Sequence, residues 1–182
     1  MLVKMKIKNY KVEIEIPEGV EARVDGKAVV VKGAKGEVRR VLSNPQLKIS
    51  VEDGKITINA KTATKREKTM IGSFRSHIKN MITGVTDGYV YQLKICSGHF
   101  PMNVSVSGKE FIVKNFIGEK VPRKMPIKDN VTVKVEGDIV KVEGKDIELA
   151  GQTSASIEQL TKRTKYDRRI FQDGIYIISK PK

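Results

Sequence analysis

The chain has 182 residues, of which 39% are hydrophobic, with no Trp and five Phe, which suits one or two compact domains with modest apolar cores. Its 35 Lys and Arg outweigh 21 Asp and Glu, and the net charge of +14 favours a polyanionic partner. We find no apolar run of about 18 residues and no signal-peptide core, so we expect no membrane partner and a cytoplasmic location. The single cysteine, Cys96, excludes a framework of internal disulfides.

Alternating apolar and polar residues in the first half predict half-buried strands. The apolar positions recur at a spacing of two, as Val12, Ile14 and Ile16, then Leu47, Ile49 and Val51, then Ile56 and Ile58. Asp25-Gly26 and Asp53-Gly54 fall between these runs and suit tight hairpins that need positive φ. The strands are therefore expected to pair in an antiparallel manner.

From Lys65 the spacing changes to that of an amphipathic helix. Apolar residues now recur every three to four positions, at Met70, Phe74, Ile78, Met81 and Ile82, whereas Lys68, Arg75 and Lys79 fall on other faces. We expect this helix to end between residues 81 and 89, where Gly84 and Gly88 allow the chain to turn.

The second half repeats the same order of elements. Period-two runs at residues 89–95, 104–106 and 131–135 predict strands, and a helix is expected from about Asp146 to Lys162, with Asp146 as its N-cap. A last apolar run at residues 175–178 predicts a strand that returns to the second sheet.

A tandem duplication explains this repetition. Gly26, Lys27, Lys32 and Gly36 recur as Gly108, Lys109, Lys114 and Gly118, at a constant offset of 82. Residues 47–58 also match 131–142, and residues 70–72 match 149–151. We therefore predict an α+β fold of two tandem duplicated domains, residues 1–82 and 83–182, each an antiparallel-rich β-sheet covered by one α-helix.

Three arrangements of residues could carry chemistry, but each has a plainer interpretation. Cys96 and His99 are close enough for a thiol and its base, but no third group orients them. The acids Glu136, Asp138, Glu143, Asp146 and Glu148 match no calcium loop. The Gly33-Ala34-Lys35-Gly36 segment has the form of an RNA-clamping loop, yet it lies between strands instead of helices, which favours a tight turn. We predict no catalytic residues, no metal site and no cofactor.

Basic residues gather in two places. Lys162, Arg163, Lys165, Arg168 and Arg169 surround Tyr166, and Lys61, Lys65, Arg66, Lys68, Arg75 and Lys79 lie around the first helix. Arginine holds phosphate through two hydrogen bonds, and a tyrosine ring can lie against a sugar or base. Two such clusters on so basic a chain favour a nucleic-acid surface over a merely solvated one, although the basic residues around the first helix would equally serve packing between the halves.

Longer strings of residues resemble a known family. Residues 80–89 (NMITGVTDGY), preceded by Phe74-Arg75-Ser76, and residues 140–152 (VKVEGKDIELAGQ) are similar to signatures of the sixth large-subunit ribosomal protein family. Residues 166–177 (YDRRIFQDGIYI) resemble its archaeal or eukaryotic form and depart from the bacterial pattern. The resemblance covers essentially the whole chain.

This resemblance implies a structural constituent of the large ribosomal subunit, with no catalysis, that binds large-subunit rRNA near the stalk base and the sarcin-ricin loop. Neighbouring large-subunit ribosomal proteins and nearby translation factors are the implied protein partners. The family gives the main rRNA anchor to the second domain, although residues 1–82 have 18 basic and 9 acidic residues, net +9, against 17 and 12, net +5, in residues 83–182. The site residues carried over are Lys162, Arg163, Lys165, Tyr166, Arg168 and Arg169, then Ser97, Gly98 and His99, then Lys180 and Lys182.

Two alternatives stay open at this point. The chain would also suit a general polyanion-binding module outside the ribosome, with similar affinity for duplex DNA, heparin and rRNA. A small hydrolase that uses Cys96 and His99 would instead have a thiol of lowered pKa. Neither alternative explains the long matching strings.

Overall fold

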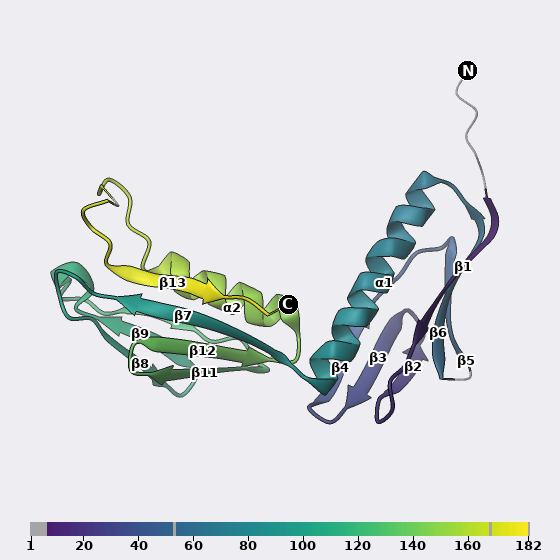
Figure 1. Cartoon of the computed structure of the whole chain (residues 1–182), viewed down its shortest axis with the longest axis horizontal. Helices are drawn as coiled ribbons and strands as arrows, with labels where there is room; N and C mark the ends of the chain where they lie inside the picture. The colour runs from purple at the N-terminus through teal and green to yellow at the C-terminus, as the bar shows by residue number, and fades with distance from the viewer. Residues whose placement is uncertain (1–6, 53, 168, 182) are drawn as a thin grey trace, which may run out of the picture. The chain divides into compact units, whose positions relative to one another are not determined.

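The computed structural model describes residues 7–52, 54–167 and 169–181 (Figure 1). The chain divides into two compact units, residues 1–87 and 88–182. A boundary at residue 82 stays a prediction, and the first helix extends across that position to Thr86.

The strands of the first unit form two antiparallel sheets of three strands each in the described residues. One sheet has the order β1–β6–β5, with β1 at Ile7–Glu15, β6 at Lys55–Ala63 and β5 at Leu47–Glu52. The other has the order β2–β3–β4, with β2 at Glu21–Asp25, β3 at Ala28–Gly33 and β4 at Gly36–Val41. Gly33 pairs with Gly36, so the segment between them is a hairpin turn, as predicted.

The helix α1 (Lys65–Thr86) begins at a capping box. The Thr64 side chain accepts a hydrogen bond from Arg66 N, and Glu67 Oε2 accepts one from Thr64 N at 2.8 Å, which satisfies backbone donors that have no partner within the helix. Its apolar face is buried and contacts both sheets of the unit, through β3 and β4 and through β1 and β6. Gly84, expected to help end the helix, instead lies buried within it.

The second unit repeats this plan and extends it. Its larger sheet has the order β11–β12–β7–β13, with β11 at Val131–Glu136, β12 at Ile139–Gly144, β7 at Tyr89–Cys96 and β13 at Gly174–Ser179. Its smaller sheet has the order β10–β9–β8, with β10 at Arg123–Pro126, β9 at Glu110–Lys114 and β8 at Asn103–Ser107. A short 3₁₀ turn follows β9 at Phe116–Gly118.

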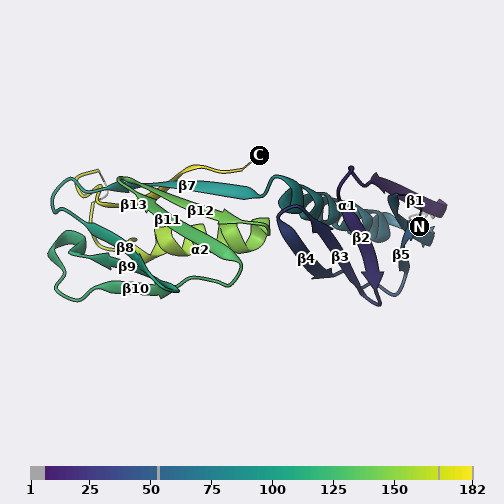
Figure 2. The same cartoon turned by 90° about the horizontal axis from the view of Figure 1, so that it is seen from below.

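The helix α2 (Ile147–Leu160) contacts all four strands of the larger sheet and also β10 (Figure 2). Its predicted N-cap is confirmed, because the Asp146 side chain accepts a hydrogen bond from Glu148 N at 2.8 Å. Buried Ala150 and Ile157 face a core that includes Leu93, Val140 and Ile175.

The two units confirm the predicted α+β class with antiparallel sheets and one helix in each half. The strand order β1–β6–β5 in the first unit corresponds to β7–β12–β11 in the second. Each unit also has a second, three-stranded sheet, so the strands of each half are divided between two sheets. The strand β13 lies beyond β7 and has no counterpart beside β1 in the described part of the first unit.

Glycines at two positions of the first unit make a matched test of this packing. A Cβ on Gly33 would lie 2.8 Å from Val85 Cγ2 and 3.0 Å from the Val85 carbonyl oxygen, whereas a Cβ on Gly72, exposed in α1, would meet nothing within 4 Å. We expect Gly33→Ala to lower the free energy of unfolding by about 1–3 kcal/mol because it forces α1 away from the sheet. Gly72→Ala should raise it by about 0.5–1 kcal/mol through helix propensity. Urea unfolding of the whole chain measures both, and equal effects of the two substitutions would contradict this close approach.

Candidate nucleic-acid interface

Two loops that are far apart in sequence meet at one end of the second unit. Asp173, which immediately precedes β13, accepts hydrogen bonds at Oδ1 from the backbone N–H groups of Gly98 at 2.6 Å and His99 at 3.0 Å. Its Oδ2 lies 2.7 Å from His99 Nδ1. The Asp173 carboxylate therefore joins the loop at residues 97–99 to the end of the loop at residues 162–173, called here the C-terminal loop.

The Asp173 side chain is only 1% exposed, and the His99 side chain is 42% exposed. Burial by itself raises the pKa of the Asp173 carboxyl, but the hydrogen bonds from His99 and Gly98 outweigh it, and the net result is a lowered pKa. Because the carboxylate is ionised at neutral pH and can only accept, His99 Nδ1 must carry the proton. The opposite ring nitrogen, Nε2, is then the one left for an outside ligand.

Aromatic rings and a guanidinium continue this contact along the surface. The His99 ring stacks on Phe171 with centroids 5.0 Å apart, and Tyr166 meets Phe171 edge to face, also at 5.0 Å. The guanidinium of Arg163 lies over the Tyr166 ring, 4.4 Å from its centroid. Four side chains from two loops thus form one continuous surface, called here the aromatic row.

A cluster of charged groups contacts Arg163, the last member of the aromatic row. Glu119 accepts two hydrogen bonds from Arg123, each at 2.7 Å, and also lies 3.5 Å from Arg163. Hydrogen bonding to Arg123 lowers the pKa of the Glu119 carboxyl. Arg123 further donates to the carbonyl of Leu160 at 2.6 Å and lies over the Phe116 ring, so it caps the C-terminal end of α2.

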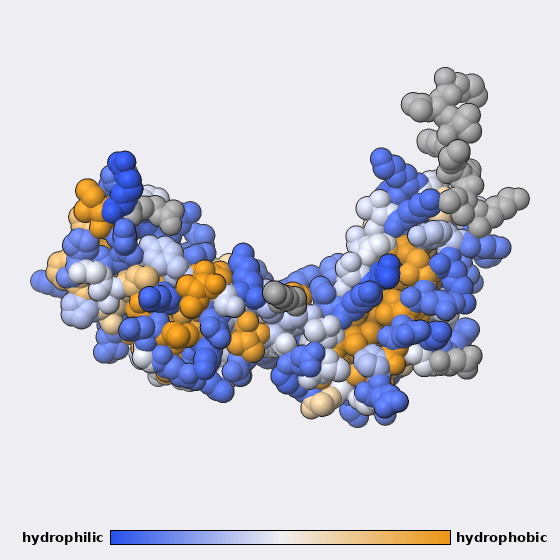
Figure 3. All heavy atoms as spheres, viewed as in Figure 1, coloured by the Kyte–Doolittle hydropathy of each residue, from blue (hydrophilic) through white to orange (hydrophobic). Residues whose placement is uncertain are grey.

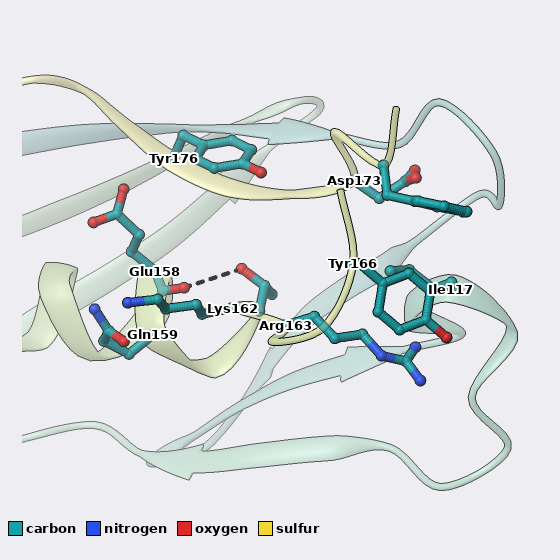
Figure 4. A pocket seen from close by; sticks show the side chains of 10 residues that line it. Ile117, Glu158, Gln159, Lys162, Arg163, Tyr166, Asp173 and Tyr176 are labelled. Carbon is teal, nitrogen blue, oxygen red and sulfur yellow. Dashed lines mark hydrogen bonds between the residues drawn. The ribbon is translucent and has the colours of Figure 1, made fainter. Parts of the chain in front are cut away.

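The C-terminal loop is closed at its base. The buried Thr161 hydroxyl accepts a hydrogen bond from Ile175 N at 2.9 Å, which links the end of α2 to the start of β13. Thr161 also lines a cavity of about 190 Å³. Figure 4 shows Lys162, Arg163 and Tyr166 lining it from the C-terminal loop, with Tyr176 of β13 on the other side.

The predicted basic residues differ in how freely they are presented. Lys162 and Lys165 are exposed, and neither ammonium has an ion-pair partner within the described residues. Arg169 is exposed but pairs with Asp167, at 2.8 Å between Nη2 and Oδ2, and this hydrogen bond lowers the pKa of the Asp167 carboxyl. Two further predicted residues, Arg168 and Lys182, lie outside the described residues.

Lys180 is the one described candidate that the structure separates from the rest. The six residues of β13 lead away from Gly174, which pairs with Cys96 beside the 97–99 loop. At about 3.3 Å per residue, this strand places Lys180 about 20 Å from the aromatic row. In the first unit, Lys65, Arg66, Lys68, Arg75 and Lys79 are exposed on α1.

The groups considered for catalysis or metal binding have other roles here. The expectation that no third group orients His99 is wrong, because Asp173 Oδ2 lies 2.7 Å from His99 Nδ1 and fixes the imidazole in place. Cys96 is a half-buried residue of β7. Among the acids, Glu136 pairs with Lys141 at 2.6 Å, Glu143 with Lys134 at 3.5 Å, and Asp146 caps α2. Among the described residues, no group of three or more His, Cys, Asp and Glu is placed to hold a metal ion, and no helix is long and apolar enough to cross a membrane.

Sequence reasoning missed the residues that fix this surface. The predicted site did not include Asp173, Phe171, Glu119 or Arg123. Asp173 and Phe171 contact the predicted residue His99, and Glu119 contacts Arg163. Arg123 in turn donates hydrogen bonds to Glu119. Nothing in their spacing reveals contacts across 74 positions, such as that between His99 and Asp173. Only an aromatic and an acid just after the basic tract, at Phe171 and Asp173, were available as a signal.

The second unit of this duplicated α+β fold thus presents a basic, aromatic surface. Comparison with known proteins gives the class to which the protein belongs. The sequence profile of the family described as "Ribosomal protein L6" matches residues 16–88 and 100–174. The "Large ribosomal subunit protein uL6" of Natronomonas pharaonis is 43% identical over 171 residues, which cover 94% of this chain and 97% of that protein. The chain belongs to the ribosomal protein L6 family, which makes it a structural ribosomal protein and not an enzyme.

The linkage through Asp173 is open to a pH test. Because its pKa is lowered on folding from the usual 3.8, the stability it contributes is present above about pH 4 and is lost as the pH falls through the lower folded value. We expect Asp173→Asn to reduce the free energy of unfolding at pH 7 by about 1.5–3 kcal/mol, and the difference from wild type to shrink below about pH 4. Urea unfolding from pH 7 to pH 3 measures this. Asp138→Asn, at an exposed carboxylate of the same unit, is the control, and a difference for Asp173→Asn that does not vary with pH would refute the assignment.

Proposed function

We propose that the second unit binds large-subunit rRNA through the aromatic row and the lysines beside it, as the main anchor of this protein in the large ribosomal subunit. The observation that supports this is the joining of the 97–99 loop to the C-terminal loop by the buried Asp173 carboxylate. It places His99, Tyr166 and Arg163 on one surface, together with exposed Lys162 and Lys165.

The chemistry of this surface suits RNA in two ways. Ammonium and guanidinium groups neutralise phosphates and release condensed counterions, which gives affinity without selectivity. Aromatic rings stack on unpaired bases, and RNA is read mainly through its shape and its unpaired bases. Held by Asp173 and Glu119, the rings and Arg163 lose little further freedom when they bind.

Membership of the family supports a proposal for the position within the subunit. We propose contact with rRNA near the stalk base and the sarcin-ricin loop, with neighbouring large-subunit proteins alongside and translation factors nearby. Ser97 and Gly98 would approach the backbone of the RNA beside His99. Lys180 and Lys182 would make a separate, weaker contact, and the basic face of α1 a lesser anchor.

A general polyanion-binding module is the second candidate. The net charge of +14 supports it, because charge alone attracts any polyanion. A polyanion-binding module predicts that loss of any exposed basic residue weakens binding equally. The rRNA proposal predicts that only basic residues on the one surface affect the affinity strongly.

Charge reversal separates these candidates. We expect the triple variant Lys162→Glu, Lys165→Glu and Arg169→Glu to weaken binding to an rRNA fragment of the stalk base and sarcin-ricin region by at least about tenfold near 0.1 M salt. The slope of log affinity against log salt should become shallower by about 0.9 for each phosphate that the variant no longer neutralises. Filter retention across a salt series measures both quantities.

The matched control is Lys109→Glu, Lys124→Glu and Lys134→Glu, which changes the net charge equally at exposed positions outside the site. If both triple variants lose affinity alike, and duplex DNA and heparin bind as well as the rRNA fragment, the polyanion module is the better description. Circular dichroism of each variant checks that it is folded.

A further inference from the structure

The free edge of β1 is the counterpart of an edge that is occupied in the second unit. There, β13 pairs antiparallel with β7 and contacts α2, with Ile175 fully buried. In the first unit, no strand in the described residues pairs with the outer edge of β1. An unpaired edge presents backbone N–H and C=O groups that accept an added strand.

The internal match fixes which positions correspond. The matches of β6 with β12 and of α1 with α2 place Ile14 at the position of Leu93, and Lys79 at that of Glu158. In the second unit, Leu93 lies opposite Ile177, and Glu158 accepts a hydrogen bond from Ile177 N at 3.4 Å. The first unit therefore has the apolar position for an added strand, but with a basic residue where the second unit has an acidic one.

A groove lies where the added strand would be. It runs between β1 and α1, with Ile14 and Ile82 among its lining residues and Arg75 and Lys79 on the helix side. Figure 3 shows apolar residues gathered in a band over this part of the first unit. Half-buried Val12 and Ile16 continue the apolar side of β1.

The charges around the groove favour an acidic occupant. On the strand side, Glu13 pairs with Lys11 at 2.7 Å and Glu15 with Lys55 at 3.6 Å, so these acids are matched by lysines of the same sheet. On the helix side, Arg75 and Lys79 are exposed. An acidic group that lay along α1 would gain from both.

We propose that β1 and the groove beside α1 bind an extended acidic segment of a neighbouring protein, which adds to the sheet as an antiparallel strand. Apolar residues at alternate positions of that segment would lie opposite Ile14 and Ile16, as Ile177 and Ile175 lie opposite Leu93 and Ile95. Its acidic groups would lie against Lys79 and Arg75. This inference depends on the duplicated fold and not on the proposed rRNA site.

A synthetic peptide tests the proposal directly. The probe has the sequence of β13 followed by two glutamates, and it is titrated into the ¹⁵N-labelled full chain. We expect amide shifts to change along β1 and along residues 75–83 of α1. Lys79→Glu should weaken binding by about tenfold, since a repulsive charge replaces an attractive one. A second peptide, ending in two lysines, should bind Lys79→Glu more tightly than wild type.

Lys48→Glu is the matched control, because Lys48 is exposed on β5, at the opposite edge of the same sheet. It should leave the affinity for the acidic peptide within about twofold of wild type. Shifts confined to β5 or to the second unit would overturn the proposal, as would equal binding of both peptides to wild type and Lys79→Glu. Changes in the β1 amide shifts that grow with protein concentration alone would assign the edge to a second copy of this chain. Changes caused by the rRNA fragment would assign it to RNA. Either result overturns the proposal.

Discussion

Each unit depends on the burial of one face of a single helix against its sheets. With no tryptophan in the chain, the two cores consist mainly of aliphatic side chains, such as Ile71 and Ile78 of α1 and Ile157 of α2, packed on strands that contribute Val and Ile. Small units bury a modest fraction of their surface, so each unit depends on this contact to exclude water from its apolar core. The outer faces of the helices, the sheet edges and the loops at strand ends are then free to vary between the two copies.

The two units differ in a loop and an edge strand that lie outside the contact between helix and sheet. In the second unit the chain continues past α2, forms the C-terminal loop and returns as β13 on the edge of β7. This return brings Asp173 beside the 97–99 loop, and the aromatic row depends on it. One added strand therefore both covers a sheet edge and builds a surface, whereas the first unit, without such a strand in the described residues, keeps the edge of β1 open.

The sequence was sufficient for the features that repeat locally. Alternation at Val12, Ile14 and Ile16 and the helical spacing from Met70 to Ile82 specify strands and helix, because each reflects a short-range regularity of the backbone. The recurrence of Gly26 as Gly108 reveals the duplication because the sequence itself is repeated. The basic tract around Tyr166 was visible because its residues are neighbours in sequence. The sequence did not reveal the partners of that tract, since the contacts of His99 with Asp173 and of Arg163 with Glu119 join segments that only the folded topology brings together.

Net charge alone ranks the two halves in the opposite order to the proposed rRNA anchor, and the contacts in the second unit offer a physical reason for that proposal. Charges on α1 stand on long, exposed side chains that must be ordered when a ligand binds. In the second unit, Arg163 is already held between Glu119 and the Tyr166 ring, and His99 between Asp173 and Phe171. Part of the entropic cost of ordering is therefore met during folding, by a carboxylate that is buried and hydrogen-bonded within the folded unit. A surface with fewer charges in a fixed arrangement can then bind a defined RNA shape more selectively than a more highly charged one whose side chains must still be ordered.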